Sequence, residues 1–405
     1  MSDRLVVIGA GQAAFALAAK LRALKDERPI TIIGAEDVLP YQRPPLSKKY
    51  LMGEMAFDRL LYRDEAWYRD NSIEIIFPIK VTSIEPDTKL VRLEDGREIA
   101  YGTLVIATGA EPRRLPEHLG GALDGVLTVR SKADADRLAA EIKPQRKLLV
   151  VGGGYIGLEA AAVARHFGLD VCLIEMADRI LSRVASAETA VIMRDIHQHH
   201  GVDIREKTGI TRLIGNDQGR VIGAELADGS ILDADIVILG IGVTPNDQLA
   251  RAAGIDFNNG IVVDEFSRTS TPDIFALGDC CLLPFNGQLV RLESVPNAVD
   301  QAEALGAYLV GAAQPYQPKP WFWSDQYDVK LQIAGFNAGY DETILRQGAR
   351  DGAWSIWYFR DGQLIAVDAI NDAKAYVTGK KLLDSGKNAD RALIADPTTD
   401  LKMLL

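Results

Sequence analysis

The sequence predicts an α/β fold with two parallel sheets, each followed by a glycine-rich turn, and a smaller α+β domain at its C-terminal end. Two apolar runs that enter glycine turns, within residues 5–14 and 147–159, predict the two sheets. Continuous apolar runs are typical of parallel strands that are buried on both faces. A change to proline- and tryptophan-rich sequence after Pro315 predicts the smaller domain.

The first glycine turn lies between the apolar run that starts at Leu5 and a helix expected over residues 13–24. Gly9 makes the tight turn, Gly11 opens the backbone to a ligand, and Ala14 replaces a third glycine where helix and strand pack closely. The helix N-terminus directs its free N–H groups and the positive end of its dipole at an anion. The turn therefore predicts a pyrophosphate site of the Rossmann type.

The segment after this helix predicts a second strand and a rigid loop. Residues 30–33 are the strand, and Glu36 is the acid nearest to the usual ribose-binding position beyond it. Pro44 and Pro45 impose an extended or turn conformation, which presents Lys48 in a defined direction. A solvated surface lysine is the alternative interpretation of Lys48.

The remainder of the first domain is expected to contain short strands. Residues 73–84 and 91–99 predict antiparallel strands around a turn at residues 94–96. Residues 104–107 predict a further buried strand, which ends at Thr108–Gly109. A strand that ends in this way is a place where the chain can cross into a second domain.

The second glycine turn is more complete than the first. Gly152, Gly154 and Gly157 follow an apolar strand and open a helix, which makes a full G-x-G-x-x-G pattern. This turn lies 143 residues after the first, and two such turns indicate two nucleotide sites. Two coincidental glycine turns in a structural α/β protein are the alternative.

An acid at the end of the next strand predicts the identity of the second nucleotide. The strand at residues 170–175 ends in Glu175, 21 residues after Gly154, a spacing that suits a carboxylate on the adenosine ribose. Glu175 would repel a 2′-phosphate, so NADH is favoured over NADPH. Arg179 and Arg183 lie nearby and moderate this preference.

The chain is then expected to return to the first domain. The segment at residues 240–246 follows a hairpin around residue 228 and a strand at residues 236–239. A later strand ends at Gly278–Asp279, and ligands of such sheets bind beyond the carboxyl ends of the strands, so Asp279 is expected beside the first nucleotide. The final domain shows alternating strand patterns and a helical tail, with the strands expected at residues 329–333, 354–359 and 363–367.

Composition limits the classes of function. The chain has 405 residues, a formal net charge of −11 and three cysteines. The acidic balance disfavours nucleic-acid binding, no apolar run is long enough to span a membrane, and the chain enters its first strand without a secretory signal. A cytoplasmic protein that binds neither nucleic acid nor membrane is therefore expected.

The cysteines and histidines add two exclusions. Cys280 and Cys281 are adjacent, which is a poor geometry for a disulfide bridge, and Cys172 lies in a strand expected to be core. The segment around Lys48 has no cysteine. Disulfide reduction, which requires a reactive cysteine pair, is therefore excluded. His197 and His200 share a helical face, but no cysteine or clear acidic ligand completes a metal set, and no metal is expected.

Five signals stand in a fixed order: the first glycine turn, Thr108–Gly109, the second glycine turn, Gly240–Gly242 and Gly278–Asp279. This order resembles the two-dinucleotide flavoproteins of the glutathione reductase superfamily. The segments R-P-P-L-S-K, G-G-G-Y-I-G-L-E, E-S-V-P-N-A and W-F-W-S-D-Q-Y narrow the resemblance to bacterial ferredoxin reductases of the putidaredoxin reductase type, over nearly the whole chain. The expected division is an FAD domain at residues 1–112 and 243–320, an NAD domain at residues 113–242, and a C-terminal interface domain at residues 321–405.

The resemblance implies site residues at the matching positions. Relatives often have an acid where Ala35 stands, which leaves open whether Ala35 or Glu36 contacts the FAD ribose. Lys48 is implied near the flavin ring, and Glu159 at the nicotinamide–flavin junction, where the resemblance raises a pairing with Lys48. These two are the candidate catalytic residues. The implied FAD contacts are Gly9, Gly11, Ala13, Ala14, Ala35, Glu36, Arg43, Lys48, Val81, Thr108, Gly109, Arg130, Gly278, Asp279 and Val295, and the implied NAD contacts are Gly152, Gly154, Ile156, Gly157, Glu175 and Gly242.

The function that the resemblance implies is electron transfer from NADH through FAD to a [2Fe–2S] ferredoxin that serves a cytochrome P-450-type monooxygenase. A monomer or weak dimer is expected. The alternatives are a reductase for a rubredoxin or for an aromatic-ring dioxygenase ferredoxin, an NADH oxidase, and a nucleic-acid-binding redox sensor. For the aromatic residues Trp321, Trp323 and Tyr327, packing in the core competes with a surface role of Trp323 in docking the redox partner.

Overall fold

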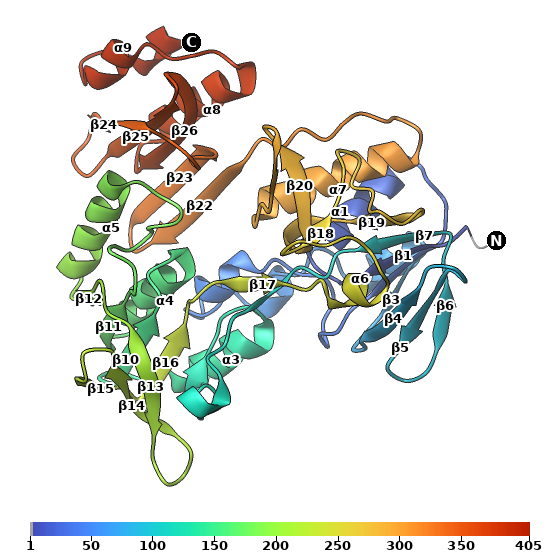
Figure 1. Cartoon of the computed structure of the whole chain (residues 1–405), viewed down its shortest axis with the longest axis horizontal. Coiled ribbons are helices and arrows are strands. Elements are labelled where there is room, and N and C mark those ends of the chain that lie inside the picture. Colours follow the sequence, from blue (N-terminus) through green and yellow to red (C-terminus); the bar gives the residue numbers. More distant parts are fainter. Residues whose placement is uncertain (1–2) are drawn as a thin grey trace. The chain divides into compact units, whose positions relative to one another are not determined.

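The computed structural model describes residues 3–405, which form two compact units. Unit 1 contains the chain up to Gln42 together with Phe57–Glu111 and Val243–Pro320. Unit 2 contains Arg43–Ala56, Pro112–Gly242 and Trp321–Leu405. The loop at Arg43–Ala56, expected in the first domain, thus packs with unit 2. Figure 1 shows the elements of both units along the chain.

Unit 1 is built on a five-stranded parallel sheet in the order β19-β7-β1-β2-β3. Its strands are β1 (Leu5–Ile8), β2 (Ile30–Ile33), β3 (Ile73–Ile76), β7 (Thr103–Ile106) and β19 (Ile274–Ala276). Ile8 lies opposite Ile33 and Ile106, so the carboxyl ends of the three central strands meet at one edge. Helices α1 (Gln12–Ala23) and α7 (Val295–Leu309) pack against each other, and both contribute to the buried core of this unit.

Unit 2 repeats this arrangement in a second five-stranded parallel sheet, ordered β12-β11-β10-β16-β9. In both sheets the strand before the glycine turn is central, with the next two strands on one side and a later strand on the other. The elements are β9 (Val126–Leu127), β10 (Lys147–Val151), β11 (Asp170–Ile174), β12 (Asp203–Arg205), β16 (Ile236–Leu239), and helices α3 (Lys132–Glu141), α4 (Tyr155–His166) and α5 (Ala187–His199).

Each unit also carries a three-stranded antiparallel sheet, which follows β3 and precedes β7 along the chain in unit 1, and follows β12 and precedes β16 in unit 2. The first is β4 (Val81–Glu85), β5 (Leu90–Leu93) and β6 (Glu98–Ala100), and the second is β13 (Ile210–Gly215), β14 (Val221–Leu226) and β15 (Ile231–Asp233). The prediction of one antiparallel strand over residues 73–84 is wrong. Ile73–Ile76 joins the parallel sheet instead, and Pro78, which has no N–H to donate to a ladder, separates it from β4.

The last part of the chain forms a five-stranded antiparallel sheet in the order β22-β23-β26-β25-β24. The predicted α/β fold with an α+β end is therefore confirmed, although β22 and β24 were not foreseen as strands. The elements are β22 (Trp321–Gln326), β23 (Val329–Gly335), β24 (Glu342–Gln347), β25 (Trp354–Arg360), β26 (Gln363–Ile370), α8 (Ala373–Ser385), α9 (Arg391–Ala395) and η5 (Leu401–Leu404).

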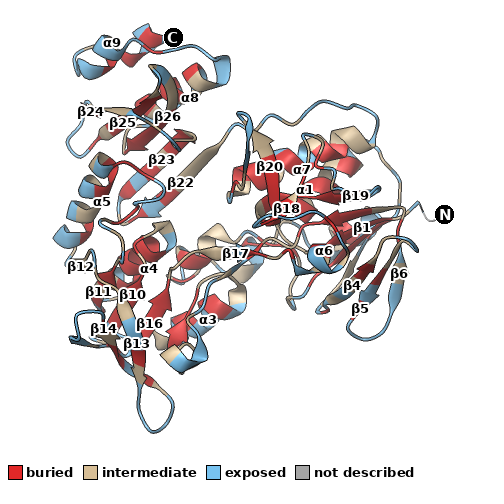
Figure 2. Cartoon of the chain, in the orientation of Figure 1, coloured by how far each residue is buried: buried red, intermediate tan, exposed pale blue. Residues whose placement is uncertain are grey.

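One buried cluster joins this end domain to the parallel sheet of unit 2. Leu331 and Ile356 of the antiparallel sheet belong to the same cluster as Leu148 and Leu158. Figure 2 shows the buried residues concentrated in the sheets and on the helix faces that cover them. The shared cluster thus packs the end domain onto the parallel sheet of unit 2.

Short elements connect these layers. They are η1 (Pro44–Ser47), η2 (Phe57–Arg59), α2 (Glu65–Asp70), β8 (Ala110–Pro112), η3 (Glu117–Leu119), β17 (Val243–Pro245), α6 (Gln248–Ala252), β18 (Ile261–Val262), η4 (Gly278–Cys280), β20 (Cys281–Phe285) and β21 (Gln288–Val290). Within the described chain, no helix has the length and apolar character that crossing a bilayer requires.

Candidate functional site

The first glycine turn of unit 1 is shaped by close backbone approach. Gly9 has φ +107°, and a Cβ on it would overlap the carbonyl oxygen of Ala107, which follows β7. A Cβ on Gly11 would meet no atom within 4 Å, so the space above this residue is open. The first glycine is therefore required by the chain itself, whereas the second leaves room for a ligand at the edge where the strands end.

The helices that follow the two glycine turns differ from the other long helices of the described chain. Of the helices with at least ten residues within 3–405, α1 and α4 begin at a glycine and have neither a side-chain cap nor an acid in the first turn. The others, α3, α5, α7 and α8, are each capped by a serine or aspartate side chain. The first-turn N–H groups of α1 and α4 are thus not occupied by a cap, and they fit an anion.

Other predicted residues of unit 1 come together around the start of α1. A Cβ on Gly278, which has φ +74°, would lie 3.6 Å from the Cβ of Ala13 and 3.7 Å from that of Ala298. Asp279 follows in η4, and Val295 is the first residue of α7. The hydroxyl of Thr108 donates to the carbonyl oxygen of Asn246 at 2.6 Å. These residues line the same edge of the sheet as the first glycine turn.

The end of β2 also approaches this turn, because a Cβ on Gly34 would lie 2.7 Å from the Cβ of Ala10. Ala35 is exposed, and Glu36 accepts a hydrogen bond from the Tyr41 hydroxyl at 2.7 Å. A short side chain at Ala35 leaves the position next to the turn uncharged. Val81 is half-buried at the start of β4.

The second glycine turn, in unit 2, repeats the geometry of the first. Gly152 has φ +105°, and its Cβ would lie 2.5 Å from the carbonyl oxygen of Gly240, which follows β16. A Cβ on Gly157 would overlap the carbonyl oxygen of Gly152, whereas a Cβ on Gly154 would meet no atom within 4 Å. The residues present therefore fit a dinucleotide pyrophosphate in this unit as well.

Glu175 is held beside the second turn by two backbone groups. Its carboxylate accepts from the N–H of Gly153 and from that of Ala177, each at 2.8 Å. The guanidinium of Arg179 donates to two backbone carbonyls, and Arg183 is exposed near Gly242. The carboxylate of Glu175 is thus fixed at the turn, while the guanidinium of Arg179 is hydrogen-bonded to backbone carbonyls.

An apolar side chain is exposed to solvent at the same turn. Ile156, the second residue of α4, is 45% exposed, although the residue before it, Tyr155, is packed against the core. Helix α4 therefore presents an apolar surface at its N-terminus, next to the open space above Gly154.

Lys48 and Glu159 form a buried ion pair within unit 2. The ammonium group of Lys48 lies 2.6 Å from Glu159 Oε2, and the two side chains are 16% and 6% exposed. The hydroxyl of Ser47 also donates to Oε2 at 3.0 Å, and the hydroxyl of Ser324 donates to Oε1 at 2.7 Å. The pairing raised by the resemblance is therefore present, and a surface lysine is excluded.

The loop that carries Lys48 is a turn of 3₁₀ helix that begins with Pro44 and Pro45, and it packs against α3 and α4. The guanidinium of Arg43, at its start, donates to the carbonyl oxygen of Arg130 at 2.9 Å. The prolines therefore produce the turn rather than the extended conformation, and the loop brings Arg43, Lys48 and Arg130 to one region of unit 2.

Sequence reasoning missed the polar residues behind Glu159. Ser324 accepts from the amide of Gln326 at 3.0 Å, and the carbonyl of that amide lies 2.7 Å from His197 Nε2. His197 is fully buried, and burial lowers its pKa to about 4. In W-F-W-S-D-Q three aromatic residues precede three polar ones, so the only signal available was the spacing of Ser324 and Gln326, which share a face if the segment forms a strand.

The histidine segment and the cysteines take structural places in the part of the chain that the structure describes. No group of three potential metal ligands occurs within residues 3–405. Cys280 and Cys281 are fully buried, and burial raises the pKa of both thiols. Cys172 was expected to be core but is only half-buried, and burial raises its pKa to about 12.

The aromatic pair Trp321 and Trp323 lies on one face of β22. Both side chains are half-buried, and their rings stack with centroids 5.5 Å apart. Tyr327, also half-buried, stacks instead on His200 at 3.7 Å. The aromatic residues of this segment thus form two separate stacks rather than one cluster.

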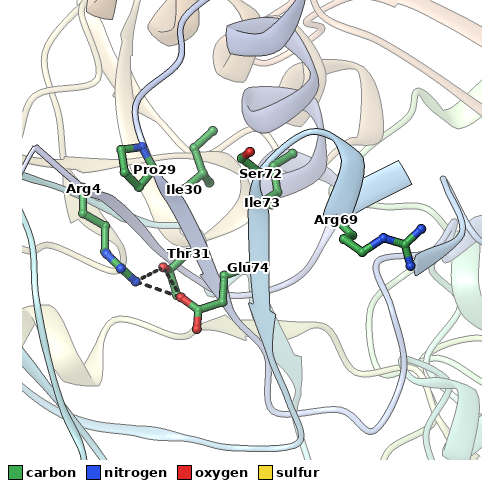
Figure 3. A pocket seen from close by; sticks show the side chains of 8 residues that line it. All are labelled: Arg4, Pro29, Ile30, Thr31, Arg69, Ser72, Ile73 and Glu74. Carbon is green, nitrogen blue, oxygen red and sulfur yellow. Dashed lines mark hydrogen bonds and ion pairs between the residues drawn. The ribbon is translucent and has the colours of Figure 1, made fainter. Parts of the chain in front are cut away.

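A shallow hollow of about 230 Å³ lies at the opposite edge of the unit 1 sheet (Figure 3). There Arg4 donates to the hydroxyl of Thr31 at 2.7 Å and to the carboxylate of Glu74 at 2.8 Å. These residues stand at or near the amino ends of their strands, whereas the glycine turn follows the carboxyl ends. The hollow is therefore distinct from the dinucleotide edge.

Comparisons with known proteins place the chain among reductases. The family described as pyridine nucleotide-disulphide oxidoreductase matches residues 3–302, and the reductase C-terminal family matches residues 321–405. A ferredoxin–NAD(P)+ reductase of a Sphingomonas species is 44% identical over 98% of this chain and 95% of its own. Putidaredoxin reductase of Pseudomonas putida is 37% identical over 100% of this chain and 97% of its own.

A solved structure agrees with the sequence comparisons. The crystal structure of the covalent putidaredoxin reductase–putidaredoxin complex matches with a TM-score of 0.96 and 35% identity, and the match covers 99% of this chain and 98% of that chain. The match therefore includes the antiparallel end domain as well as both parallel sheets.

Proposed function

The chain belongs to the pyridine nucleotide-disulphide oxidoreductase family, and on this premise we propose that it is an FAD-dependent NADH:[2Fe–2S] ferredoxin reductase. The observation that carries the proposal is the repeated glycine turn. In each of the two parallel sheets the central strand leads into a turn with an open glycine and then an uncapped helix, and four strands follow the same order, β7-β1-β2-β3 in unit 1 and β16-β10-β11-β12 in unit 2. Two dinucleotides, one in each unit, are the ligands that this repetition suits.

In unit 1, we assign FAD to the first glycine turn. Gly9, Gly11, Ala13 and Ala14 would hold its pyrophosphate, and Asp279 would hold its ribityl chain. Bound FAD supplies the conversion of two-electron hydride chemistry into the single-electron steps that an iron–sulfur cluster needs. The remaining assigned FAD contacts in unit 1 are Ala35, Glu36, Val81, Thr108, Gly109, Gly278 and Val295. Arg43, Lys48 and Arg130 belong to unit 2, and their assignment to FAD rests on the resemblance alone.

In unit 2, we assign NADH to the second glycine turn. Gly152, Gly154, Ile156 and Gly157 would line the pyrophosphate end, and Gly242 the nicotinamide side. The carboxylate of Glu175 would accept from the adenosine ribose hydroxyls. A 2′-phosphate would meet this fixed negative charge, which supports NADH over NADPH.

Lys48 and Glu159 are the residues that we assign to the chemical step. The Lys48 ammonium would stabilise the negative charge that accumulates when a hydride is accepted. Glu159 would orient that ammonium group, because the two side chains form a buried ion pair. No nucleophile is required, which agrees with the burial of Cys280 and Cys281.

For the electron acceptor we propose a [2Fe–2S] ferredoxin that serves a cytochrome P-450-type monooxygenase. A rubredoxin or the ferredoxin of an aromatic-ring dioxygenase is the second candidate, since the chemistry is the same and the partner alone differs. We further propose that the protein is cytoplasmic and is a monomer or weak dimer.

Anaerobic titration with NADH, followed by cytochrome c reduction with and without added ferredoxins, tests the proposal. NADH is expected to bleach the flavin absorption, and a [2Fe–2S] ferredoxin is expected to stimulate cytochrome c reduction strongly. Parallel assays with a rubredoxin and with a dioxygenase ferredoxin rank the partners. NADH turnover that consumes oxygen at the same rate without any ferredoxin would identify an oxidase instead.

A further inference from the structure

A continuous chain of hydrogen-bonded side chains runs from Glu159 into the end domain. Ser324 Oγ lies 2.7 Å from Glu159 Oε1, and Gln326 Nε2 lies 3.0 Å from Ser324 Oγ. His197 Nε2 lies 2.7 Å from Gln326 Oε1, and the Tyr327 hydroxyl lies 3.1 Å from His197 Nδ1. These contacts connect α4, β22 and α5 within unit 2.

The middle residues of this hydrogen-bonded series are closed to water. Ser324 and His197 have no exposed surface, and Gln326 is 1% exposed. Buried polar atoms are costly unless each finds a partner, so a chain that satisfies every member specifies one arrangement. The end domain contributes Ser324, Gln326 and Tyr327, while the glycine-turn domain contributes Glu159 and His197.

The hydrogen bonds in this series can run in only one direction from donor to acceptor, because the last acceptor is the carboxylate of Glu159. A carboxylate accepts and cannot donate, so the Ser324 hydroxyl must donate to Glu159. Ser324 can then accept from the amide of Gln326, which turns the amide carbonyl toward His197. His197 must therefore carry its proton on Nε2 and accept at Nδ1, where the Tyr327 hydroxyl donates.

The hydrogen-bonded series can orient Glu159, but it cannot transport protons. The amide of Gln326 has no proton that it readily passes on, so the chain does not conduct protons between Tyr327 and Glu159. Its effect is to hold one oxygen of Glu159 toward Ser324 and to leave the other oxygen for Lys48 and Ser47. The position of the Lys48 ammonium group thus depends on residues of the end domain.

We propose that Ser324, Gln326, His197 and Tyr327 are positioning residues that orient the Glu159–Lys48 ion pair through this one-way hydrogen-bond chain. The proposal rests on the proposed function, in which Lys48 and Glu159 act in the chemical step. It adds a role for the end domain, which orients the ion pair of the glycine-turn domain.

Nitrogen NMR of His197 in the purified flavoprotein tests the direction of the chain without any NADH. The wild-type protein is expected to show neutral His197 with its proton on Nε2 at pH 7. The Gln326→Met variant removes the carbonyl acceptor and is expected to lose this preference. A proton on Nδ1, or a cationic ring at pH 7, in the wild-type protein would overturn the proposal.

Rapid mixing with NADH tests the positioning role. Ser324→Ala is expected to lower the limiting rate of flavin reduction about tenfold, the effect that loss of one hydrogen bond to a charged group carries, with less than twofold change in NADH affinity. Ser324→Thr keeps the hydroxyl and is expected to restore most of the rate.

Ser355→Ala is the matched control, because Ser355 is a fully buried serine of the same sheet that bonds the Trp357 indole instead. Equal rates in Ser324→Ala and Ser355→Ala would overturn the positioning role. A wild-type protein that NADH does not reduce would overturn the proposed function, whereas the His197 measurement would still decide the direction of the chain.

Discussion

Lys48 is the residue whose replacement most directly tests the assigned chemistry. Lys48→Met keeps the length of the side chain but removes the charge that faces Glu159 at 2.6 Å. We expect the limiting rate of flavin reduction by NADH to fall at least about tenfold, since electrostatic stabilisation of this kind commonly contributes that much or more. Stopped-flow absorbance under anaerobic conditions measures this rate. Lys49→Met, at the exposed neighbour, is expected to change it little, and an equal loss in both variants would contradict the assignment.

In the proposed coenzyme site, Glu175 is the residue that we expect to discriminate between NADH and NADPH. Glu175→Gln keeps the shape and one acceptor oxygen but removes the negative charge. We expect kcat/KM for NADH to fall about tenfold, as for a lost hydrogen bond to a charged group, and the value for NADPH to rise. Steady-state kinetics with both coenzymes measures the ratio. Glu206→Gln is the control, because Glu206 bonds the backbone of Ile180 nearby, and a similar shift in this variant would contradict the role of Glu175.

Asp368 makes the stability of unit 2 depend on pH. Its carboxylate is fully buried and accepts from the hydroxyls of Tyr358 and Thr189, and burial raises its pKa to about 6. The folded state therefore binds the proton more tightly than the unfolded state. The free energy of unfolding contributed by Asp368 is present at low pH and is lost as pH rises through 6.

Between pH 5 and pH 8 this loss amounts to about 1 kcal/mol, from the linkage of the folded and unfolded pKa values. Urea unfolding at the two pH values is expected to show a smaller difference in Asp368→Asn than in the wild-type protein. Asp351→Asn, at an exposed acid, is expected to retain the wild-type difference. A wild-type slope in Asp368→Asn would assign the pH dependence to other groups.

Helix α4 offers a test at the scale of one element. Gly154 has φ −80°, and a Cβ there would meet no atom within 4 Å, so a side chain is tolerated. Aspartate is a favoured N-cap, and as a cap it stabilises a helix as much as glycine does or by a few tenths of a kcal/mol more. Gly154→Asp is therefore expected to keep or slightly raise the stability of the protein. The same charge would occupy the anion position, and NADH affinity is expected to fall at least about tenfold.

Equilibrium NADH titration and thermal unfolding of Gly154→Asp measure the two effects, and its flavin content should remain that of the wild-type protein. Gly152→Asp is the contrasting variant, because Gly152 has φ +105° and its Cβ would press on the carbonyl oxygen of Gly240. It is expected to destabilise unit 2. Unchanged NADH affinity in Gly154→Asp would contradict a coenzyme site at this helix.

The elements around both glycine turns could be predicted because their signals are local. An apolar run, a glycine turn and a helix lie within about 20 consecutive residues, and Lys147–Val151 and Tyr155–His166 occupy the expected places. Strand β22 could not be predicted in the same way. The sequence favours core packing for Trp321 and Trp323 but also allows a surface role for Trp323, and the inner face of the strand is decided by pairing with β23.

The candidate site was predictable only where side chains are close in sequence or match a motif. The pairing of Lys48 with Glu159 was raised by the resemblance alone, since 111 residues separate them. Ser324 and His197 carry no motif, and their roles depend on distant elements that packing brings together. Polar residues that act through tertiary contacts of this kind are not visible in local patterns.

At the scale of the whole chain, the end domain of unit 2 is not an independent body. The cluster that contains Leu331, Ile356 and Tyr358 also contains Leu148 and Leu158 around the second glycine turn. A chain that ends at Pro320 would expose the partners of these side chains to water. Each large buried side chain that loses its cover costs about 1.5–3 kcal/mol, and several such losses exceed the usual stability of a domain.

We therefore expect the chain truncated after Pro320 to be insoluble or to lose the cooperative unfolding of unit 2. Circular dichroism during urea titration and limited proteolysis between residues 112 and 242 measure this loss. A shorter truncation after Ser385, which removes α9 and η5 but keeps the sheet, is expected to retain cooperative unfolding at lower stability, because those elements cover Leu382 and Trp357 rather than the shared cluster. If the Pro320 truncation instead unfolds cooperatively and resists proteolysis, the glycine-turn domain folds without its end domain. In that case the end domain is needed for the orientation of Glu159 by Ser324 but not for folding.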